Sequence, residues 1–354
     1  MNSHATRLEA IQRQLADEQL DALVVVSPAN VRYLSGFTGE GTLVVGRQDL
    51  LIATDGRYKL EAECTVDGCE ASFHAGGHLA GAADFLTRLN ASAVAFEADY
   101  LTYATYQDVA GKLPNATLRP AKGWVEQLRL VKDPSEIDAM REAARRVDAA
   151  LEQFVAGLKV GETERQLAWQ LETLMMEQGT KASFATILAT GPSAASPHAV
   201  PGDRRLAEGD MVKIDVGGKV DGYCSDITRT YFVGEPDAKF VEVYNLVKRA
   251  QAAAVEAVCA GATGQALDSI ARQIITDGGY GPEFAHGLGH GVGLEVHEGP
   301  RVSSRSEDTL QTGMVITIEP GIYLQGWGGV RIEDMVAVTN TGCEVLTKAA
   351  KAEY

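Results

Sequence analysis

The chain has 354 residues, of which 45% are hydrophobic and 23% are charged, and its formal net charge is −16 at pH 7. This length exceeds what one hydrophobic core usually supports, so two domains are expected, and the composition is that of an ordinary globular protein. The negative charge repels nucleic-acid backbones and anionic membrane surfaces, which excludes both as expected partners.

The N-terminal residues and the cysteines indicate a compartment. Residues 1–20 carry charges throughout and lack the apolar stretch and cleavage site of a secretory signal. No apolar run approaches the roughly 20 residues that span a bilayer. The five cysteines include no CxxC pair and are odd in number, which is typical of reduced thiols. The sequence therefore predicts a cytoplasmic protein.

The first third of the chain alternates between helix and strand patterns. Its helices show apolar residues at helical spacing, and its strands are short apolar runs. The expected elements, in chain order, are helix 5–20, strand 21–27, strands 41–46 and 49–54 as a hairpin, helix 82–89 and strand 93–97. We therefore expect a smaller α/β domain over residues 1–122, and residues 118–136 have the character of a connector.

The rest of the chain begins with helices and continues with strands. Asp133 can cap a long helix, Pro134 takes its first position, and Glu136 completes a capping box. The elements expected after it are helix 164–178, strands 183–190, 210–218 and 225–234, helices near 237–259 and 264–277, and strands 313–321 and 330–339. This order predicts an α+β fold with a mixed sheet, and no internal repeat stands out.

Two aspartates lie at the ends of a predicted hairpin. Asp215 ends an apolar strand, Asp226 begins the returning strand, and GGKVDG at residues 217–222 suits the turn between them. Antiparallel pairing would bring the two carboxylates together. Like charges that face each other destabilise a sheet, so we expect a group that neutralises them.

Two glutamates repeat this pattern further along the chain. Glu319 follows a near-continuous apolar strand, and Glu333 lies inside another. A buried carboxylate is costly unless it is paired or bound to a metal. Pairing with Arg229 or Arg331, or exposure at a strand end, would explain any one of these residues. Four such carboxylates in one domain favour a metal site instead.

The stretch HGLGHGVGLEVHEGP, residues 286–300, places three histidines among five glycines. A packed core does not use this composition, so we expect a loop that brings one histidine to the carboxylates, with glycines that leave room for a substrate. Four carboxylates and one imidazole suit Mn²⁺, with Co²⁺, Fe²⁺ and Zn²⁺ at the borderline. Five ligands are enough for two metals about 3.5–4 Å apart, the arrangement that generates a bridging hydroxide for hydrolysis.

Other catalytic motifs do not fit the sequence. HEGPR, which starts at His297, lacks the second histidine of a zincin HExxH motif. The sequence contains no GxSxG elbow, no GxGxxG after a strand and no P-loop.

Five segments resemble the creatinase/prolidase/methionine aminopeptidase family, whose fold is called pita-bread. The segments are PH at 197–198, IDVGGKVDGYCSDITRT at 214–230, HGLGHGVGLEVHE at 286–298, TIEPGIY at 317–323 and GVRIEDMV at 329–336. They stand in the family's order and spacing. The resemblance implies a catalytic domain over residues 123–354, with a curved mixed or antiparallel sheet flanked by helices, after the smaller N-terminal α/β domain.

The resemblance also implies a ligand set for two divalent metals, with Asp226 and Glu333 bridging them. The implied ligands are Asp215, Asp226, His290, Glu319 and Glu333. Mn²⁺ is the expected metal, and Co²⁺ or Zn²⁺ would suit the same ligands. Glu319 would in addition carry a proton from the nucleophile to the leaving nitrogen.

Side chains around the metals receive roles from the same resemblance. His297 would stabilise the oxyanion of the tetrahedral intermediate, and His198 would be catalytic or orient the substrate. His286 would line the pocket for the residue after the scissile bond. Arg331 would orient ligand carboxylates or a water, and Tyr323 would line the same pocket. Taken alone, each of these histidines would more often be structural.

The N-terminal domain indicates the subfamily. A folded domain over residues 1–122 is unlike a methionine aminopeptidase, and GFTGEG at 36–41 resembles the short bacterial aminopeptidase P type more than typical prolidases. Retention of all five ligands argues against creatinase and against inactive relatives. We therefore predict a dimetal Xaa-Pro aminopeptidase. The alternatives are an Xaa-Pro dipeptidase restricted to dipeptides and, more remotely, a non-enzymatic peptide-binding relative.

The predicted reaction is cleavage of the bond before proline, where the tertiary amide has no N–H for an ordinary peptidase to bind. A two-metal site can hold the free α-amine and the scissile carbonyl together while the hydroxide attacks. The expected partners are proline-containing peptides and a second copy of the chain. In that homodimer, the N-terminal domain would contribute to the partner's active site.

Overall fold

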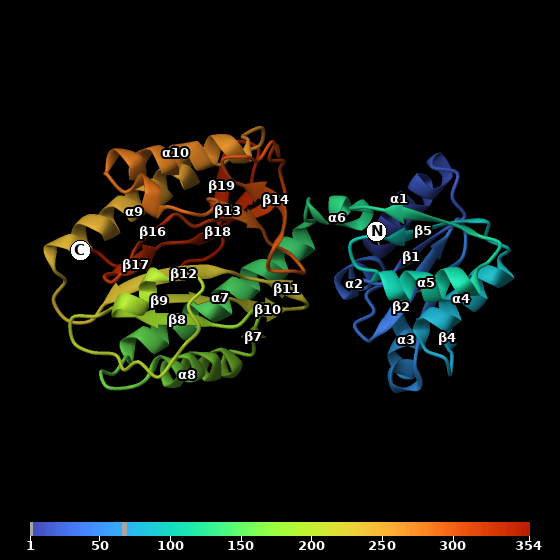
Figure 1. Ribbon diagram of the computed structural model, residues 1–354, viewed down its shortest axis with the longest axis horizontal. Coiled ribbons are helices and arrows are strands. Elements are labelled where there is room, and N and C mark those ends of the chain that lie inside the picture. The colour runs from blue at the N-terminus through green and yellow to red at the C-terminus, as the bar shows by residue number, and fades with distance from the viewer. Residues whose placement is uncertain (1–2, 66–68) are drawn as a thin grey trace. The chain divides into compact units, whose positions relative to one another are not determined.

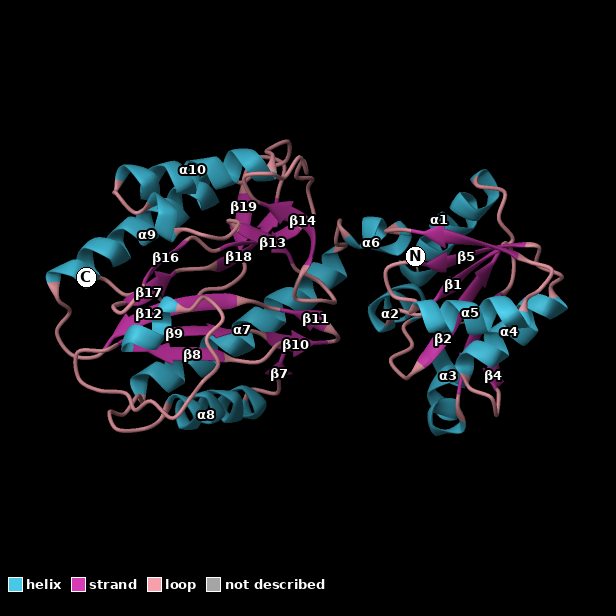
Figure 2. Ribbon diagram, in the orientation of Figure 1, coloured by secondary structure: helices cyan, strands magenta, loops and turns pink. Residues whose placement is uncertain are grey.

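The computed structural model describes residues 3–65 and 69–354. The chain divides into two compact units, Met1–Arg129 and Leu130–Tyr354. Figure 1 labels the helices and strands of both units in chain order, and Figure 2 distinguishes them by type.

The first unit is built on a six-stranded mixed sheet with the order β4-β3-β2-β1-β5-β6. β1 pairs in parallel with β5 and antiparallel with β2. β2 also pairs antiparallel with β3, which confirms the predicted hairpin of these two strands. The strands are β1 (Ala22–Val25), β2 (Gly41–Gly46), β3 (Leu50–Thr54), β4 (Glu70–Phe73), β5 (Ala93–Glu97) and β6 (Thr117–Ala121). The helices are α1 (Ser3–Asp17), α2 (Pro28–Ser35), α3 (Lys59–Thr65), α4 (His78–Arg88), α5 (Tyr103–Lys112) and α6 (Trp124–Arg129).

Apolar side chains are buried on both faces of this sheet, and those on one face pack against α4. Phe85 and Leu86 of α4 pack with Val44 of β2 and Leu51 of β3. The unit is therefore an α/β domain, as predicted. The expected connector is more structured than the sequence suggested, because it contains most of β6 and all of α6.

The second unit begins with the predicted long helix, α7 (Pro134–Ala156). The Asp133 carboxylate accepts hydrogen bonds from the backbone amides of Ser135 and Glu136, at 2.9 and 3.0 Å. Glu136 in turn accepts one from the Asp133 amide at 2.8 Å. The capping box and Pro134 at the first position therefore start the helix where the sequence predicts it.

Two sheets and four helices form the body of this unit. The remaining helices are α8 (Glu164–Glu177), α9 (Ala238–Glu256) and α10 (Gly264–Asp277). A three-stranded sheet has the order β12-β9-β8, and a five-stranded sheet has the order β14-β13-β15-β18-β19. The strands are β8 (Ile187–Thr190), β9 (Met211–Val216), β12 (Ile227–Phe232), β13 (Gly289–Gly291), β14 (Glu298–Val302), β15 (Val315–Ile318), β18 (Asp334–Val338) and β19 (Cys343–Val345). Two smaller sheets comprise β7 (Lys181–Ala182), β10 (Gly218–Val220) and β11 (Tyr223–Cys224), and β16 (Gly321–Leu324) and β17 (Gly328–Arg331).

The helices cover the strands in pairs, as Figure 2 shows. Leu151 of α7 and Leu167 of α8 share a core with the sheet of β8, β9 and β12. Val243 of α9 and Leu267 of α10 share another core with β15 and β18. The strands are thus enclosed between helices, which confirms the predicted α+β architecture of mixed sheets flanked by helices.

The two halves of the second unit repeat one pattern: a helix pair, then antiparallel strands. Thr163 and Thr263 cap the second helix of each pair by accepting a hydrogen bond from a backbone amide. Gly161 and Gly261 each donate to a leucine carbonyl further along the chain, both at 2.8 Å. No repeat was expected from the sequence, although Gly161 and Thr163 recur in it as Gly261 and Thr263.

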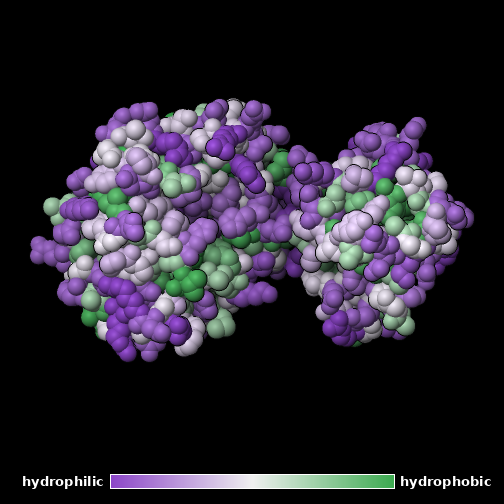
Figure 3. All heavy atoms as spheres, in the orientation of Figure 1, coloured by the Kyte–Doolittle hydropathy of each residue, from purple (hydrophilic) through white to green (hydrophobic). Residues whose placement is uncertain are grey.

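The exterior is mainly hydrophilic on the face that Figure 3 displays, with apolar residues scattered among polar ones. Among the described residues, no helix combines the length and hydropathy needed to cross a membrane. Cys69, Cys224, Cys259 and Cys343 are free thiols, as predicted, whereas the side chain of Cys64 lies outside the described part of the chain.

Candidate metal centre

Four acidic side chains meet where two antiparallel strand pairs end. Asp215 lies in β9, and Asp226 directly precedes β12, which pairs with β9. The antiparallel arrangement predicted for this hairpin is confirmed. Glu319 directly follows β15, and Glu333 directly precedes β18, the strand that pairs with β15. Each half of the repeat therefore contributes two carboxylates.

His290 joins these carboxylates from the centre of β13. Its Nε2 lies 3.4 Å from Glu319 Oε1 and 3.6 Å from Asp226 Oδ2. Its Nδ1 lies 3.0 Å from the carbonyl oxygen of Gly291, and a proton on Nδ1 would leave Nε2 free to bind a cation. Burial lowers the pKa of His290, which favours the neutral form that binds metals.

The glycines beside His290 are required by the neighbouring strands. A Cβ added at Gly289 would lie 2.0 Å from the carbonyl oxygen of Thr317, and one at Gly291 would lie 1.8 Å from that of Gly299. The sequence predicted a glycine loop that leaves room for a substrate. Instead, these two glycines belong to a strand and let the backbones of β14 and β15 approach it.

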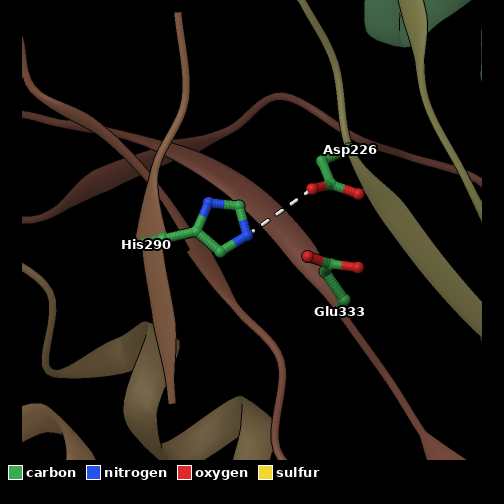
Figure 4. A group of neighbouring side chains, drawn as sticks. All are labelled: Asp226, His290 and Glu333. Carbon is green, nitrogen blue, oxygen red and sulfur yellow. Dashed lines mark ion pairs between the residues drawn. The ribbon is translucent and has the colours of Figure 1, made fainter. Parts of the chain in front are cut away.

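Three of the side chains converge closely enough to share one cation. One ligand atom each from Asp226, His290 and Glu333 lies within 4.8 Å of the others. Figure 4 shows the imidazole of His290 and both carboxylates pointing toward a common point. Asp226 and Glu333 are 4% and 2% exposed, so water screens their charges poorly.

Asp215 is held by a buried arginine. Arg331 donates from Nη2 to Asp215 Oδ2 and from Nε to Thr228 Oγ1 at 2.9 Å. Thr228 in turn donates to Glu333 Oε2 at 2.7 Å. The other oxygen of Asp215, Oδ1, is buried and has no hydrogen-bond partner among the described residues. A buried acceptor of this kind is suited to binding a cation.

The carboxylates raise one another's pKa. Burial, followed by the charges of Glu333 and Asp215, raises the pKa of Asp226 well above its usual range. Burial and the charges of Glu319 and Asp215 do the same to the pKa of Glu333. Burial raises the pKa of Glu319 to about 7, although Arg331 opposes it. The cluster carries more negative charge than the Arg331 guanidinium offsets.

These observations fit a divalent cation site. The donors are carboxylate oxygens with one imidazole, which suits Mn²⁺ and neighbouring divalent ions. A cation would neutralise the buried charge and supply a partner for Asp215 Oδ1. The structure brings together all five side chains that the sequence singled out as ligands, because all five line one cavity.

The cavity has a volume of about 520 Å³ and lies entirely within the second unit. Its lining combines the acidic cluster with apolar side chains. The apolar lining residues are Phe184, Ala185, Ile187, Pro197, Ala199, Val200, Pro201 and Val296. A volume of this size is within the range of ordinary small-ligand sites.

Two further histidines face this cavity from exposed positions. His198 and His297 are both exposed and both line it. The ring of His297 lies 4.4 Å from that of His290, centroid to centroid, at an angle of 59°. Burial and then the neighbouring His290 lower the pKa of His297. Both side chains can therefore reach a molecule bound beside the carboxylates.

His286 lines the cavity as a neutral, well-anchored side chain. Burial lowers its pKa to about 4. Its Nε2 lies 3.1 Å from the Tyr323 hydroxyl, and its Nδ1 lies 2.8 Å from the Gly287 carbonyl oxygen. Arg272 donates to the His286 carbonyl at 2.8 Å. Tyr323 contacts His286 and Arg331 but is outside the described cavity lining, so its hydroxyl acts on the cavity through those two residues.

Two supporting residues were not predicted from the sequence. Thr228 links Arg331 to Glu333, and Lys213 donates to backbone carbonyls of the segment that carries His198. Both lie two residues from a predicted ligand in a strand, so alternation places them on the ligand's face. That alternation, and a lysine within an apolar strand, were the signals available for these positions.

Comparisons with known families and structures identify proteins that are similar to this chain. Residues 138–340 match the model of metallopeptidase family M24, and residues 7–131 match that of the creatinase/prolidase N-terminal domain. An Xaa-Pro dipeptidase from Pyrococcus furiosus is 38% identical over 98% of both chains.

Solved structures extend the likeness. One is an Xaa-Pro dipeptidase from Bacillus anthracis, with 39% identity, a TM-score of 0.95 and 99% of both chains covered. Another is an X-Pro aminopeptidase from Thermotoga maritima, with 35% identity, a TM-score of 0.89, and 94% of this chain and 97% of that chain covered. These likenesses confirm the predicted two-domain pita-bread fold.

Proposed function

The chain belongs to metallopeptidase family M24 and is a metallo-exopeptidase, and from this premise we propose that it hydrolyses the peptide bond between an N-terminal residue and a following proline. The observation that carries the proposal is the convergence of Asp226, His290 and Glu333 inside a cavity with an apolar lining. The acidic cluster suits a divalent cation, and the apolar lining suits a pyrrolidine ring.

Between the two forms of this activity, we favour the dipeptidase. Relatives with 38% and 39% identity over nearly the whole chain carry the name Xaa-Pro dipeptidase. The Xaa-Pro aminopeptidase expected from the sequence remains the second candidate. It is supported by the relative from Thermotoga maritima with 35% identity and by the exposed side chains of His198 and Val200 at the cavity.

We propose that two divalent cations are held by the five residues predicted from the sequence. The proposed ligands are Asp215, Asp226, His290, Glu319 and Glu333, with Asp226 and Glu333 shared between the cations. When bound, divalent cations supply Lewis acidity and lower the pKa of water toward neutrality. Mn²⁺ is the proposed ion, and Co²⁺ and Zn²⁺ suit the same donors.

The residues around the ligands then divide the remaining work. Glu319 would carry a proton from the nucleophile to the leaving proline nitrogen. His297 can donate a hydrogen bond to the oxygen on which negative charge develops. His198 would orient the substrate, and neutral His286 would contact the residue after the scissile bond. Arg331 keeps Asp215 in place.

A comparison of two substrates tests the proposal. Protein loaded with Mn²⁺ is incubated with an Xaa-Pro dipeptide and, separately, with an Xaa-Pro-Xaa tripeptide. Cleavage of the dipeptide alone supports the dipeptidase, and preferential cleavage of the tripeptide supports the aminopeptidase. Cleavage of neither peptide by protein with measured metal content would refute the peptidase proposal.

The predicted homodimer and cytoplasmic location remain part of the proposal. A dimer would let the N-terminal domain of one copy limit the length of peptide bound by the other. Sedimentation equilibrium measures the mass in solution. A monomer that discriminates between the two peptides would contradict this role for the partner.

A further inference from the structure

The Glu164 carboxylate holds both ends of a loop that forms part of the cavity wall. Glu164 is the first residue of α8 and is 3% exposed. Its Oε1 accepts hydrogen bonds from the Thr190 amide at 2.8 Å, the Thr190 hydroxyl at 3.0 Å and the Ser193 hydroxyl at 2.5 Å. Its Oε2 accepts one from the Gly202 amide at 3.0 Å. One carboxylate therefore ties together the two ends of residues 190–202, the rim loop.

The middle of the rim loop is held by hydrogen bonds from two buried side chains, Lys213 and Arg331. Lys213 donates from Nζ to the carbonyls of Ala194, Ser196 and Pro197, at 3.1, 2.5 and 3.3 Å. Arg331 donates from Nη1 to the carbonyl of Pro197 at 3.3 Å. The backbone on the N-terminal side of His198 is thus held by these donors, while the two ends are held by Glu164.

The part of the rim loop that faces the cavity alternates between exposed and half-buried side chains, and Ala199 packs against the hydrophobic core. It contributes the five consecutive lining residues Pro197, His198, Ala199, Val200 and Pro201. Val200 is 87% exposed, and His198 is exposed as well. Because the exposed side chains of His198 and Val200 do not hold the segment in place, its position depends on the packing of Ala199 and on the polar anchors.

We propose that Glu164 is a positioning residue for substrate binding, which acts by holding the rim loop so that His198 and Val200 meet the bound peptide. This inference rests on the proposed peptidase function of the same cavity. Glu164 itself does not line the cavity in the described chain. Its effect reaches the substrate through the backbone at Thr190 and Gly202.

The isosteric substitution Glu164→Gln tests this role. Whichever way the amide turns, its NH₂ group faces a backbone N–H, of either Thr190 or Gly202, so one anchor is lost. A buried donor without an acceptor weakens the local structure, and a displaced binding group reduces kcat/KM by about tenfold. We expect KM for an Xaa-Pro peptide to rise by about tenfold while kcat stays within about twofold, because the loop contributes binding.

A milder substitution and a control accompany it. Ser193→Ala removes one hydrogen bond to Glu164 Oε1 and should shift KM in the same direction by a smaller factor. Glu177→Gln removes an exposed carboxylate from the other end of α8 and should leave KM unchanged. Hydrogen exchange of the rim-loop amides should accelerate by about tenfold or more in Glu164→Gln and should not change in Glu177→Gln. The visible spectrum of the Co²⁺-loaded protein should not change.

The outcomes separate this inference from the proposed function. Wild-type protein that cleaves no Xaa-Pro peptide contradicts the function. Active wild-type protein with unchanged KM and unchanged rim-loop exchange in Glu164→Gln overturns the inference. A fall in kcat as large as the fall in kcat/KM, together with a changed Co²⁺ spectrum, would also overturn it, because Glu164 would then act on the metal centre. If Glu164→Gln does not fold, an unchanged KM in folded Ser193→Ala overturns the inference.

Discussion

Asp215 and Arg331 form a buried pair in which only one carboxylate oxygen is used. Arg331 donates to Asp215 Oδ2, and the buried Oδ1 is without a hydrogen-bond partner in the described chain. The pair is one-sided because Arg331 also donates to Thr228 and Tyr323, at 2.9 and 3.1 Å. Arg331 therefore orients Asp215 and leaves its other oxygen available to a cation.

Replacing Asp226 should remove metal and activity together. Asp226→Asn keeps the shape of the side chain but takes away the negative charge that the proposed cations share. Replacing a residue that only supports a metal ligand lowers activity by up to about 100-fold. We expect the loss of a ligand itself to exceed about 100-fold. Metal per chain is measured by elemental analysis. Asp221→Asn, at an exposed turn in the same hairpin, is the matched control. Full activity in Asp226→Asn would mean that the site lies elsewhere.

Removing the positively charged guanidinium of Arg331 should destabilise the metal-free protein. Arg331→Met leaves Asp215 buried at 8% exposure without its guanidinium partner. Breaking a buried pair in this way costs about 3–5 kcal/mol in the free energy of unfolding. Urea denaturation with a chelator present measures the loss. Arg165→Met breaks a surface pair of 2.9 Å with Asp203 and should cost less than about 1 kcal/mol. Equal losses in the two variants would contradict the buried role.

Metal affinity should rise with pH up to about 7. Burial raises the pKa of Glu319 from 4.5 to about 7, so the metal-free protein retains this proton at acidic pH. A cation must displace it, and affinity should therefore fall by about tenfold per pH unit below 7 for each proton released. Calorimetric titration with Mn²⁺ at pH 6 and pH 8, in two buffers, measures affinity and proton release. Affinity that does not change between these pH values would count against Glu319 as a ligand.

The same shift has a consequence for stability without metal. Because the folded-state pKa of Glu319 is raised, its contribution to stability is fully present below pH 4.5 and is lost as the pH rises to about 7. His286 acts in the opposite direction: its contribution is present above pH 6.5 and is lost as the pH falls to about 4. A Glu319→Gln variant isolates the first effect when thermal unfolding is followed with a chelator present.

Adding one methyl group beside His290 should disrupt the centre. The Cβ of Gly291→Ala would lie 1.8 Å from the carbonyl oxygen of Gly299, so β13 and β14 would have to separate. We expect a loss of about 1–3 kcal/mol in stability and weaker metal binding. Gly111→Ala, where a Cβ meets nothing within 4 Å, is the control. A Gly291→Ala protein that keeps wild-type stability and metal content would show that the strands can move apart freely.

Local signals in the sequence were sufficient for the elements that depend on them. The start of α7 followed from Asp133, Pro134 and Glu136, because capping uses only neighbouring residues. β6 was missed because Pro120 and exposed side chains hide an edge strand, where the missing N–H of a proline is tolerated. β10 was read as a turn because its pairing with β7 depends on Lys181, far away in the chain.

The candidate site likewise contains some residues that the sequence reveals and others that only the tertiary structure reveals. Asp215, Asp226, Glu319 and Glu333 were visible because carboxylates at the ends of apolar strands are unusual. The hydrogen bond from Thr228 to Glu333 was not visible, because it joins residues 105 positions apart. The role of Glu164 depends equally on a tertiary contact, with Gly202. Sequence reasoning therefore found the charges that need a partner and missed the groups that hold them.

The division of the second unit into two similar halves affects how it would assemble. Asp215 and Asp226 come from the first half, whereas His290, Glu319 and Glu333 come from the second. A break in residues 233–237, between β12 and α9, would give two fragments, neither of which carries the complete set. A divalent cation that binds the complete set would therefore hold the two fragments together.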